Sequence, residues 1–271
     1  MLRGWILFVS LWVLVSAKGI YSKEITLFSH FTDSSPSVTG ERILLKQTFT
    51  PASTFKYWIV LFLLEQNLVS PDLKMPSSET HIPNSPRDLN LRDAMFYSSN
   101  SFFLSFLKDD LQRYSQLEDT LIRIGFVSGK FKKPFLDKKN VYFSKAILVS
   151  PEFQHNFMVE FLKDEGGSKN VSPKTFRLWK DAAFWSFCDS QNSIVYGKTG
   201  SLGGAFWFLG FLEKRQSFLN RLWNGSRKKE YTVITVLQTG EGANREGAIR
   251  SFYRSAGCEG ELDQIGLRIS E

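Results

Sequence analysis

The pattern of apolar and polar positions predicts strands followed by a buried helix in the first quarter of the chain. Residues 25–31 and 43–49 are short apolar runs on either side of a turn-rich stretch at 33–36, and both runs are predicted to be strands. Residues 54–65 are apolar on nearly every face and are long enough for a buried helix. We therefore expect a helix with little solvent contact next to a sheet.

Later segments alternate between helical and strand patterns. Residues 71–86 are rich in Pro and Ser and are predicted to be a surface connection. A helix start is predicted at 87–95, and a second apolar helix at 102–107. Strand patterns return at 193–197, 205–212 and 231–238. These strands are predicted to be antiparallel neighbours, with Lys198 projecting from an edge strand.

The first 17 residues have the layout of a cleaved signal peptide. They contain a lone Arg3, an apolar run over 5–15 and small residues before a predicted cleavage after Ala17. The apolar run is shorter than the roughly 20 residues that span a bilayer. We therefore expect an exported protein, periplasmic or secreted, with one domain over 18–271 and no stable membrane insertion.

Composition indicates a packed domain with a modest positive charge. Of the 271 residues, 42% are apolar and 15% aromatic, enough for a core. The 34 Lys and Arg, of which only Arg3 lies in the leader, against 27 Asp and Glu leave an excess of six positive charges. Lysine-rich segments at 130–145 and 227–229 could attract an anionic polymer, but are interpreted as a solvated loop and turn. Aromatic residues do not interleave with these lysines, so a nucleic-acid partner is not expected.

Cysteines and histidines are few, which limits the chemistry. Cys188 and Cys258 either pair in an oxidising compartment or remain buried free thiols. His30, His81 and His155 are isolated, with no second ligand at metal-binding spacing, so no metal is expected and a zinc hydrolase is excluded. None of them lies beside a nucleophile elbow. If the chain carries a catalytic base, it is expected to be a lysine.

Ser53 and Lys56 form the first of three short motifs with catalytic potential. On a helix these two residues share one face, a turn apart. Burial on an apolar helix lowers the pKa of a lysine and makes it a useful base for a serine nucleophile. Taken alone, however, Ser-x-x-Lys recurs by chance, and an exposed serine beside an extended surface lysine explains it equally well.

The other two motifs are Ser98-Ser99-Asn100 and Lys198-Thr199-Gly200. In the first, the Ser98 hydroxyl could relay a proton and Asn100 could hold a substrate carbonyl, although helix capping explains the same residues. In the second, a cation beside a hydroxyl and glycines suits close approach of a carboxylate, although a charged turn would look the same.

Together and in this order, the motifs resemble those of the penicillin-recognising serine enzymes, and among them the class D β-lactamases, or oxacillinases. The resemblance covers roughly residues 50–257, and Pro51-Ala52-Ser53-Thr54-Phe55-Lys56 matches the class D nucleophile segment. Arg245 falls at the position of the family's substrate-binding arginine, twelve residues before Gly257. Further similar segments are Arg87–Arg92, Ile147–Pro151 and Trp207–Gly210.

The resemblance implies a fold and a set of roles. The fold would be α/β (α+β) and DD-peptidase/β-lactamase-like: a central antiparallel sheet from both chain ends, flanked by helices, with a helical lobe inserted at about 69–189. Ser53 would be the nucleophile, Lys56, carboxylated by carbon dioxide, the base, and Ser98 the proton relay, assisted by Lys198. The substrate would be a β-lactam or a peptidoglycan stem peptide. Substrate-binding residues would be Asn100, Thr199, Gly200, Ser201 and Arg245, with the backbone N–H groups of Ser53 and Ser201 as oxyanion hole.

Three departures from the class D pattern concern the second half of the reaction. Asn100 replaces an apolar residue and makes the lysine pocket more polar, which disfavours the neutral amine that carboxylation requires. Residues 126–129 lack the family's Tyr-Gly-Asn, and Tyr142 stands where a tryptophan is usual. Acylation is therefore better supported than rapid hydrolysis. An exported β-lactamase is the favoured prediction; the alternative is a penicillin-binding protein, DD-peptidase or β-lactam sensor that deacylates slowly.

Overall fold

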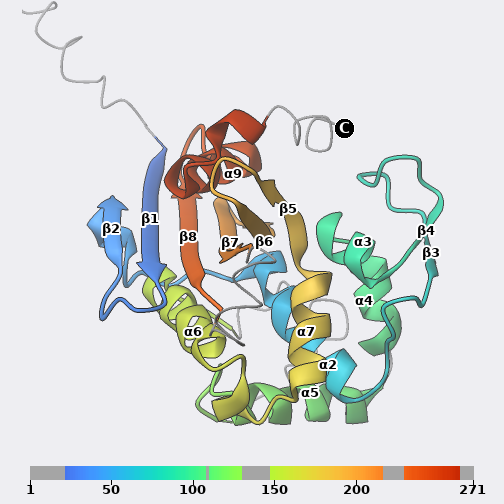
Figure 1. The fold of residues 1–271 in the computed structure, drawn as a ribbon. Coiled ribbons are helices and arrows are strands. Elements are labelled where there is room, and N and C mark those ends of the chain that lie inside the picture. Colours follow the sequence, from blue (N-terminus) through green and yellow to red (C-terminus); the bar gives the residue numbers. More distant parts are fainter. Residues whose placement is uncertain (1–21, 108–109, 130–146, 216–228, 263–271) are drawn as a thin grey trace, which may run out of the picture.

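The computed structural model describes residues 22–107, 110–129, 147–215 and 229–262 (Figure 1). The predicted leader, the lysine-rich segment at 130–145 and Tyr142 lie outside these residues. The strands are β1 (Lys23–His30), β2 (Ser37–Gly40), β3 (Met75–Ser77), β4 (Arg87–Leu89), β5 (Phe184–Cys188), β6 (Ser193–Leu202), β7 (Ala205–Lys214) and β8 (Tyr231–Thr239). The α-helices are α2 (Lys56–Glu65), α3 (Leu91–Phe96), α4 (Asn100–Leu107), α5 (Leu111–Arg123), α6 (Pro151–Lys163), α7 (Pro173–Ala182) and α9 (Arg245–Ala256). Short 3₁₀ turns are η1 (Arg42–Leu44), η2 (Ala52–Phe55), η3 (Gly167–Lys169) and η4 (Glu259–Glu261).

The two ends of the described chain meet in one antiparallel sheet. Its six strands have the order β2-β1-β8-β7-β6-β5. The first strand, β1, pairs with the last, β8, in the register Lys23↔Thr239 to His30↔Thr232. The helices from α2 to α7 are inserted between β2 and β5 (Figure 1). The predicted α/β fold with a central antiparallel sheet is thus confirmed.

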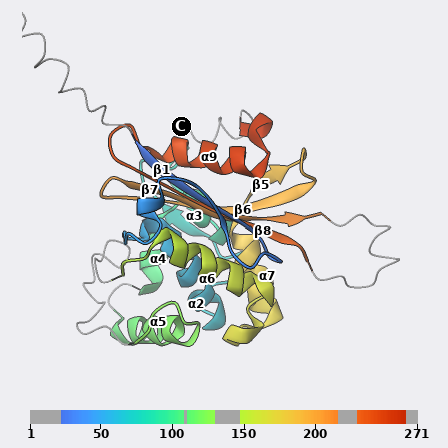
Figure 2. The same ribbon diagram turned by 90° about the vertical axis from the view of Figure 1, so that its left-hand side faces the viewer.

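Helices cover both faces of the sheet. α9 packs on one face and α6 on the other, with α2 and α7 beneath α6 and β6 (Figure 2). Alternate residues of β7 point to opposite faces of the sheet. Trp207 and Leu209 belong to the core shared with α2, whereas Phe208 and Leu212 belong to the core shared with α9. Because side chains alternate across a strand, a sheet buried on both faces needs a nearly continuous apolar run. This explains the strong patterns at 205–212 and 231–238.

The central helix α2 is buried along almost its whole length. All of its residues except Glu65 are buried, as its apolar sequence predicts. The Trp58 ring lies 4.8 Å from the Phe157 ring, centroid to centroid, and the Trp179 indole N–H donates to the carbonyl of Tyr57 at 2.9 Å. α6 and α7 therefore clamp α2, which fixes the position of its first residue, Lys56.

Three sequence predictions about secondary structure need correction. Residues 43–49 are not a strand: β1 already pairs with β8 and β2, so neither side of β1 is open to them. Instead, η1 leads to a single bridge between Phe49 and Val149, and Ile43 is 72% exposed. The helix predicted from 87 starts only at Leu91, after the short strand β4 and the N-cap Asn90.

The third correction concerns the strand that carries Lys198: β6 is an inner strand of the sheet, although Lys198 itself lies beyond its pairing with β5. The first half of β6 pairs with β5 up to Tyr196, and Gly197 then donates to the carbonyl of Ala183 at 2.9 Å. β5 belongs to the sheet, so the helical insertion ends at Ala182 rather than near Asp189. Beyond Gly197, β6 contacts the η2 turn in place of a strand. Only this second half of β6 lies at an edge.

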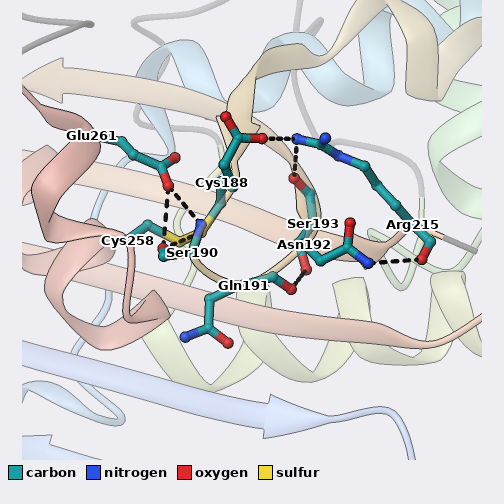
Figure 3. A network of polar contacts seen from close by, with 9 residues as sticks. Cys188, Ser190, Gln191, Asn192, Ser193, Arg215, Cys258 and Glu261 are labelled. Carbon is teal, nitrogen blue, oxygen red and sulfur yellow. Dashed lines mark hydrogen bonds and ion pairs between the residues drawn. A yellow bond between two sulfur atoms is a disulfide. The ribbon is translucent and has the colours of Figure 1, made fainter.

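Cys188 and Cys258 form a disulfide between the end of β5 and the residue that follows the α9 C-cap. Their Cα atoms are 5.6 Å apart and both side chains are fully buried. Polar contacts hold the adjoining turn, as Figure 3 shows: Ser190 donates from its backbone N–H to Glu261 at 3.0 Å. Of the two states that the sequence left open, the paired one is present.

Two further findings concern classes of function. Within the residues that the structure describes, no helix is long and apolar enough to cross a membrane. The same residues contain no cluster of His, Cys, Asp or Glu suited to hold a metal ion. His155 instead is buried between α6 and the sheet, with its ring nitrogens 2.9 Å from the Ser29 hydroxyl and 3.1 Å from the Thr235 hydroxyl.

Candidate active site

Ser53 lies in the 3₁₀ turn η2, immediately before α2. In a 3₁₀ turn residues i and i+3 eclipse each other, so Ser53 and Lys56 point the same way. The Thr54 hydroxyl fixes the turn by donating to the carbonyl of Pro51 at 2.6 Å, and it also lies 3.0 Å from Gln154 Oε1. The sequence placed Ser53 at the start of a helix; the observed turn brings the same two side chains together.

Gly200 allows strand β6 to approach this turn closely. A Cβ atom at Gly200 would lie 2.8 Å from the Pro51 carbonyl oxygen and 3.2 Å from the Thr54 backbone nitrogen. The first contact is shorter than real Cβ atoms show and the second is tight, so a side chain here would push the turn away from the strand. From the sequence, this glycine was expected to allow the close approach of a ligand. In the structure it allows the close approach of the turn that carries Ser53.

The Lys56 amine is surrounded by oxygen atoms. Nζ lies 3.4 Å from Ser53 Oγ and 3.1 Å from Ser98 Oγ. It also lies 2.7 Å from the Ser98 carbonyl oxygen and 2.7 Å from Asn100 Oδ1. These four contacts join residues from the start of α2 and the connection between α3 and α4. The serine of the second motif and the lysine of the first therefore form one site.

The contacts suit a neutral amine. A carbonyl oxygen can only accept a hydrogen bond, so Ser98 O and Asn100 Oδ1 take the two N–H groups of a neutral lysine. A neutral amine keeps one lone pair, which can accept from one hydroxyl at a time, that of Ser53 or that of Ser98. Burial lowers the pKa of Lys56 to about 7; the charge of Glu79 opposes this effect and that of Arg245 adds to it. Near neutral pH this lysine is thus poised to accept a proton.

The backbone at Ser98 is in an unusual conformation. Its φ is +61°, in the left-handed region, which costs a residue with a side chain on the order of 1 kcal/mol. Ser98 closes helix α3, since its N–H donates to the Met95 carbonyl at 3.2 Å and that of Ser99 to the Ala94 carbonyl at 3.0 Å. The turn directs both the carbonyl and the hydroxyl of Ser98 at Lys56, so the strained residue is the one with two contacts to the amine.

Lys198 and Arg245 add positive charge to the site. Lys198 is fully buried and donates to the Thr199 carbonyl at 3.1 Å. Burial lowers the pKa of Lys198 well below its usual range, and the charges of Lys56 and Arg245 lower it further. Arg245 begins α9, and its buried Nε has no hydrogen-bond partner among the described residues. The site thus disfavours positive charge on its two lysines, and an anionic ligand would offset the charge of Arg245.

Glu79 is a site neighbour that the sequence analysis did not identify. It lies in the Pro- and Ser-rich connection at 71–86, and its carboxylate accepts from the backbone N–H of Asn100 at 2.9 Å. Residues 126–129 contribute differently: the Phe126 ring packs 5.3 Å from the Trp58 ring, centroid to centroid, in the aromatic core. No local pattern marks a single glutamate in a surface connection as part of a site, so only the fold identifies Glu79.

The predicted site residues are brought together to different degrees. Direct hydrogen-bond distances connect Ser53, Lys56, Ser98 and Asn100. Lys198 and Arg245 are linked to Lys56 through their charges, and Gly200 through the Ser53 turn. Thr199 is buried next to Lys198, whereas Ser201 is exposed toward the end of β6. The roles assigned to these residues stay predictions.

The comparisons with known proteins concern the family and the fold. Residues 28–166 match the family model described as the penicillin-binding protein transpeptidase domain. No curated protein gives a significant match to the chain.

Solved structures of β-lactamases share the fold. The BPu1 β-lactamase superposes with a TM-score of 0.67 at 19% identity, covering 89% of this chain and 94% of that one. A class D β-lactamase from Bacillus subtilis gives 0.65 at 18% identity, covering 88% and 92%. The class D β-lactamase YbXI from Nostoc gives 0.66 at 20% identity, covering 87% and 94%. At these identities the likeness establishes the fold.

Proposed function

Because the chain belongs to the penicillin-binding protein transpeptidase domain family, we propose that it is an exported serine β-lactamase. Ser53 attacks the carbonyl carbon of the β-lactam ring, the ring C–N bond breaks, and water hydrolyses the resulting ester. One observation carries the proposal: a fully buried lysine with a pKa of about 7 lies 3.4 Å from the Ser53 hydroxyl. A buried base next to a hydroxyl is the arrangement that activates a serine nucleophile.

Each residue of the site has a place in this proposal. The Ser53 proton passes to Lys56 Nζ, and the Ser98 hydroxyl hands a proton on to the departing ring nitrogen. Lys198, Thr199 and Arg245 bind the substrate carboxylate, whose negative charge offsets the positive charge of Arg245. With its proton returned, Lys56 is again neutral and can activate the water that attacks the ester.

The surroundings of Lys56 favour an unmodified amine as this base. Carboxylation by carbon dioxide, as in class D enzymes, would replace one N–H of the neutral amine with a carbon atom. In the observed geometry both N–H groups already have carbonyl acceptors at 2.7 Å, on Ser98 and Asn100. Addition of bicarbonate is therefore expected to leave the turnover rate unchanged; a large stimulation would show that Lys56 is carboxylated.

Two observations support export and a β-lactam substrate. The three solved structures compared above are described as β-lactamases, two of them of class D. The buried disulfide between Cys188 and Cys258 fits an oxidising compartment outside the cytoplasm. Export would place the enzyme where β-lactams and cell-wall peptides are met.

Asn100 favours a second candidate, a penicillin-binding protein, DD-peptidase or sensor that stays acylated. The Asn100 amide oxygen lies 2.7 Å from the Lys56 amine and restrains it in one orientation. A base held in this way serves acylation, but has less freedom to turn toward a hydrolytic water. The two candidates therefore share the first chemical step and differ in the second.

Incubation with benzylpenicillin separates the candidates. Mass spectrometry is expected to show an adduct of one penicillin on the wild-type protein, together with release of the ring-opened product. Ser53→Ala, whose folding is checked by its thermal unfolding, is expected to form no adduct. A wild-type adduct that persists without product identifies the second candidate. An adduct of equal yield on Ser53→Ala would contradict the acyl-enzyme.

The pH dependence of acylation follows from the pKa of Lys56. The base must be neutral, so its active fraction is small below a pH of about 7 and approaches one above it. The acylation rate is therefore expected to rise about tenfold per pH unit below the midpoint and to level off above it. Stopped-flow or quenched mass spectrometry between pH 5 and 9 checks this. A rate that is independent of pH would exclude Lys56 as the base.

A further inference from the structure

A carboxylate on the β3–β4 connection holds the first turn of α4. Glu79 Oε1 accepts from the Asn100 backbone N–H at 2.9 Å. Glu79 Oε2 accepts from the Ser101 hydroxyl at 2.8 Å and from the Ser101 backbone N–H at 3.4 Å. It also accepts from the Ser99 hydroxyl. The carboxylate therefore binds three consecutive residues at the point where the helix leaves N–H groups without partners.

Glu79 and the Lys56 amine contact the same short segment of the chain, and both contact Asn100. Ser98 and Asn100, on either side of the fully buried Ser99, provide three of the four oxygen atoms around Lys56 Nζ. The Ser99 hydroxyl also accepts from the Phe102 N–H at 3.1 Å, which ties it to the helix. A displacement of this turn would move the acceptors away from the amine.

Glu79 also acts on Lys56 through its charge. Three basic groups act on one another in the site from different elements: Lys56 from α2, Lys198 from β6 and Arg245 from α9. Glu79 contributes the negative charge that raises the pKa of Lys56, against the effects of burial and Arg245. Hydrogen bonds from Ser99, Asn100 and Ser101 outweigh desolvation and lower the pKa of Glu79 itself. It therefore remains charged at the pH where Lys56 titrates.

We infer that Glu79 is a positioning residue of the acylation site: it fixes the Ser98–Asn100 turn against Lys56 and supplies the site's counter-charge. Its hydrogen bonds to Ser99, Asn100 and Ser101 hold the segment that contacts the Lys56 amine, and it acts through these neighbours. The inference rests on the proposed function, since it concerns the rate of the same acylation by Ser53. No motif of the serine acyl-enzymes marked this residue in the sequence.

Two substitutions separate the charge of Glu79 from its geometry. Glu79→Gln keeps the shape and removes the charge, so the pH midpoint of acylation is expected to move to lower pH. The rate at the high-pH plateau is also expected to fall by about 10-fold to 100-fold, because displaced groups cost rates of this order. Glu79→Asp keeps the charge but shortens the side chain. It is expected to keep the wild-type midpoint and to lower the plateau.

Glu65→Gln is the matched control, because Glu65 is another partly buried carboxylate, at the far end of α2 and paired with Arg123. Its acylation by benzylpenicillin is expected to match that of the wild type in rate and midpoint. Thermal unfolding gives the folded fraction of each variant, by which the rates are corrected. If Glu79→Gln does not fold, the acylation rate of Glu79→Asp at the high-pH plateau tests the inference by itself.

Failure of this inference differs from failure of the proposed function. If the wild type forms no adduct, the function is wrong and Glu79 has no acylation to support. If the wild type acylates, and Glu79→Gln retains its rate and midpoint, the positioning role is overturned. A plateau of Glu79→Asp equal to that of the wild type overturns the geometric part. Rates that fall only with the folded fraction, at an unchanged midpoint, would reduce Glu79 to a purely structural residue.

Discussion

Replacing Lys56 with methionine is expected to lower the rate of acylation by Ser53 about 1,000-fold, since a positioned general base contributes roughly 10²–10⁴-fold. Methionine keeps most of the buried stem and removes the amine. Ser53 then loses the amine that accepts its proton, and the Ser98 carbonyl and Asn100 lose their common donor. Time-resolved mass spectrometry of the penicillin adduct measures the effect. The pH dependence near 7 is expected to vanish with the amine.

Lys180→Met is the matched control for this change. Lys180 is also a buried lysine, but it lies on α7 and pairs with Glu213. In this variant Glu213 would still pair with Lys229, whose Nζ lies 3.4 Å from its carboxylate. The fold is therefore expected to survive. Lys180→Met should acylate at the wild-type rate. A loss in Lys56→Met of less than tenfold, or an equal loss in both folded variants, would show that Lys56 is not the base.

The sequence predicted the elements whose patterns arise from burial on every side. Residues 205–212 and 231–238 are strands covered by helices on both faces, and α2 is enclosed by α6 and α7. Such long apolar runs must be buried, so whether each is a strand or a helix can be predicted from the local sequence. Residues 43–49 show the limit: they are apolar enough for a strand, but β2 occupies the edge where they would pair. Competition for an edge is a property of the assembled sheet.

The same distinction applies to the site. Ser53 and Lys56 are three residues apart, so their approach follows from local geometry in either a helix or a 3₁₀ turn. The contact between Lys56 and Asn100 joins segments 44 residues apart. The motif order suggested it only through the resemblance to known enzymes. Neither local spacing nor the resemblance pointed to Glu79. Its role depends on where a loop without a repeating pattern crosses the start of α4.

The disulfide could not be decided from two cysteines either, because pairing depends on the distance between their Cα atoms. That distance is set when β5 joins the sheet beside β6 and α9 packs across β7 and β8. Cys188 is opposite Ser193, five residues before Lys198, or about 17 Å along an extended strand. The bond therefore braces the end of the sheet that lies away from the nucleophile.

Loss of this disulfide is expected to lower the free energy of unfolding by about 4 kcal/mol, because it closes a loop between residues 70 apart. The Cys188→Ser, Cys258→Ser double variant, and the wild type with a reductant, should both show the loss in guanidinium unfolding. The double variant is the control for the reductant, which should not change it further. Where both proteins are folded, acylation of Ser53 should proceed at the same rate, since the bond acts on the unfolded chain and lies far from Lys56. A loss of acylation in the folded double variant would mean instead that this end of the sheet holds the site in shape.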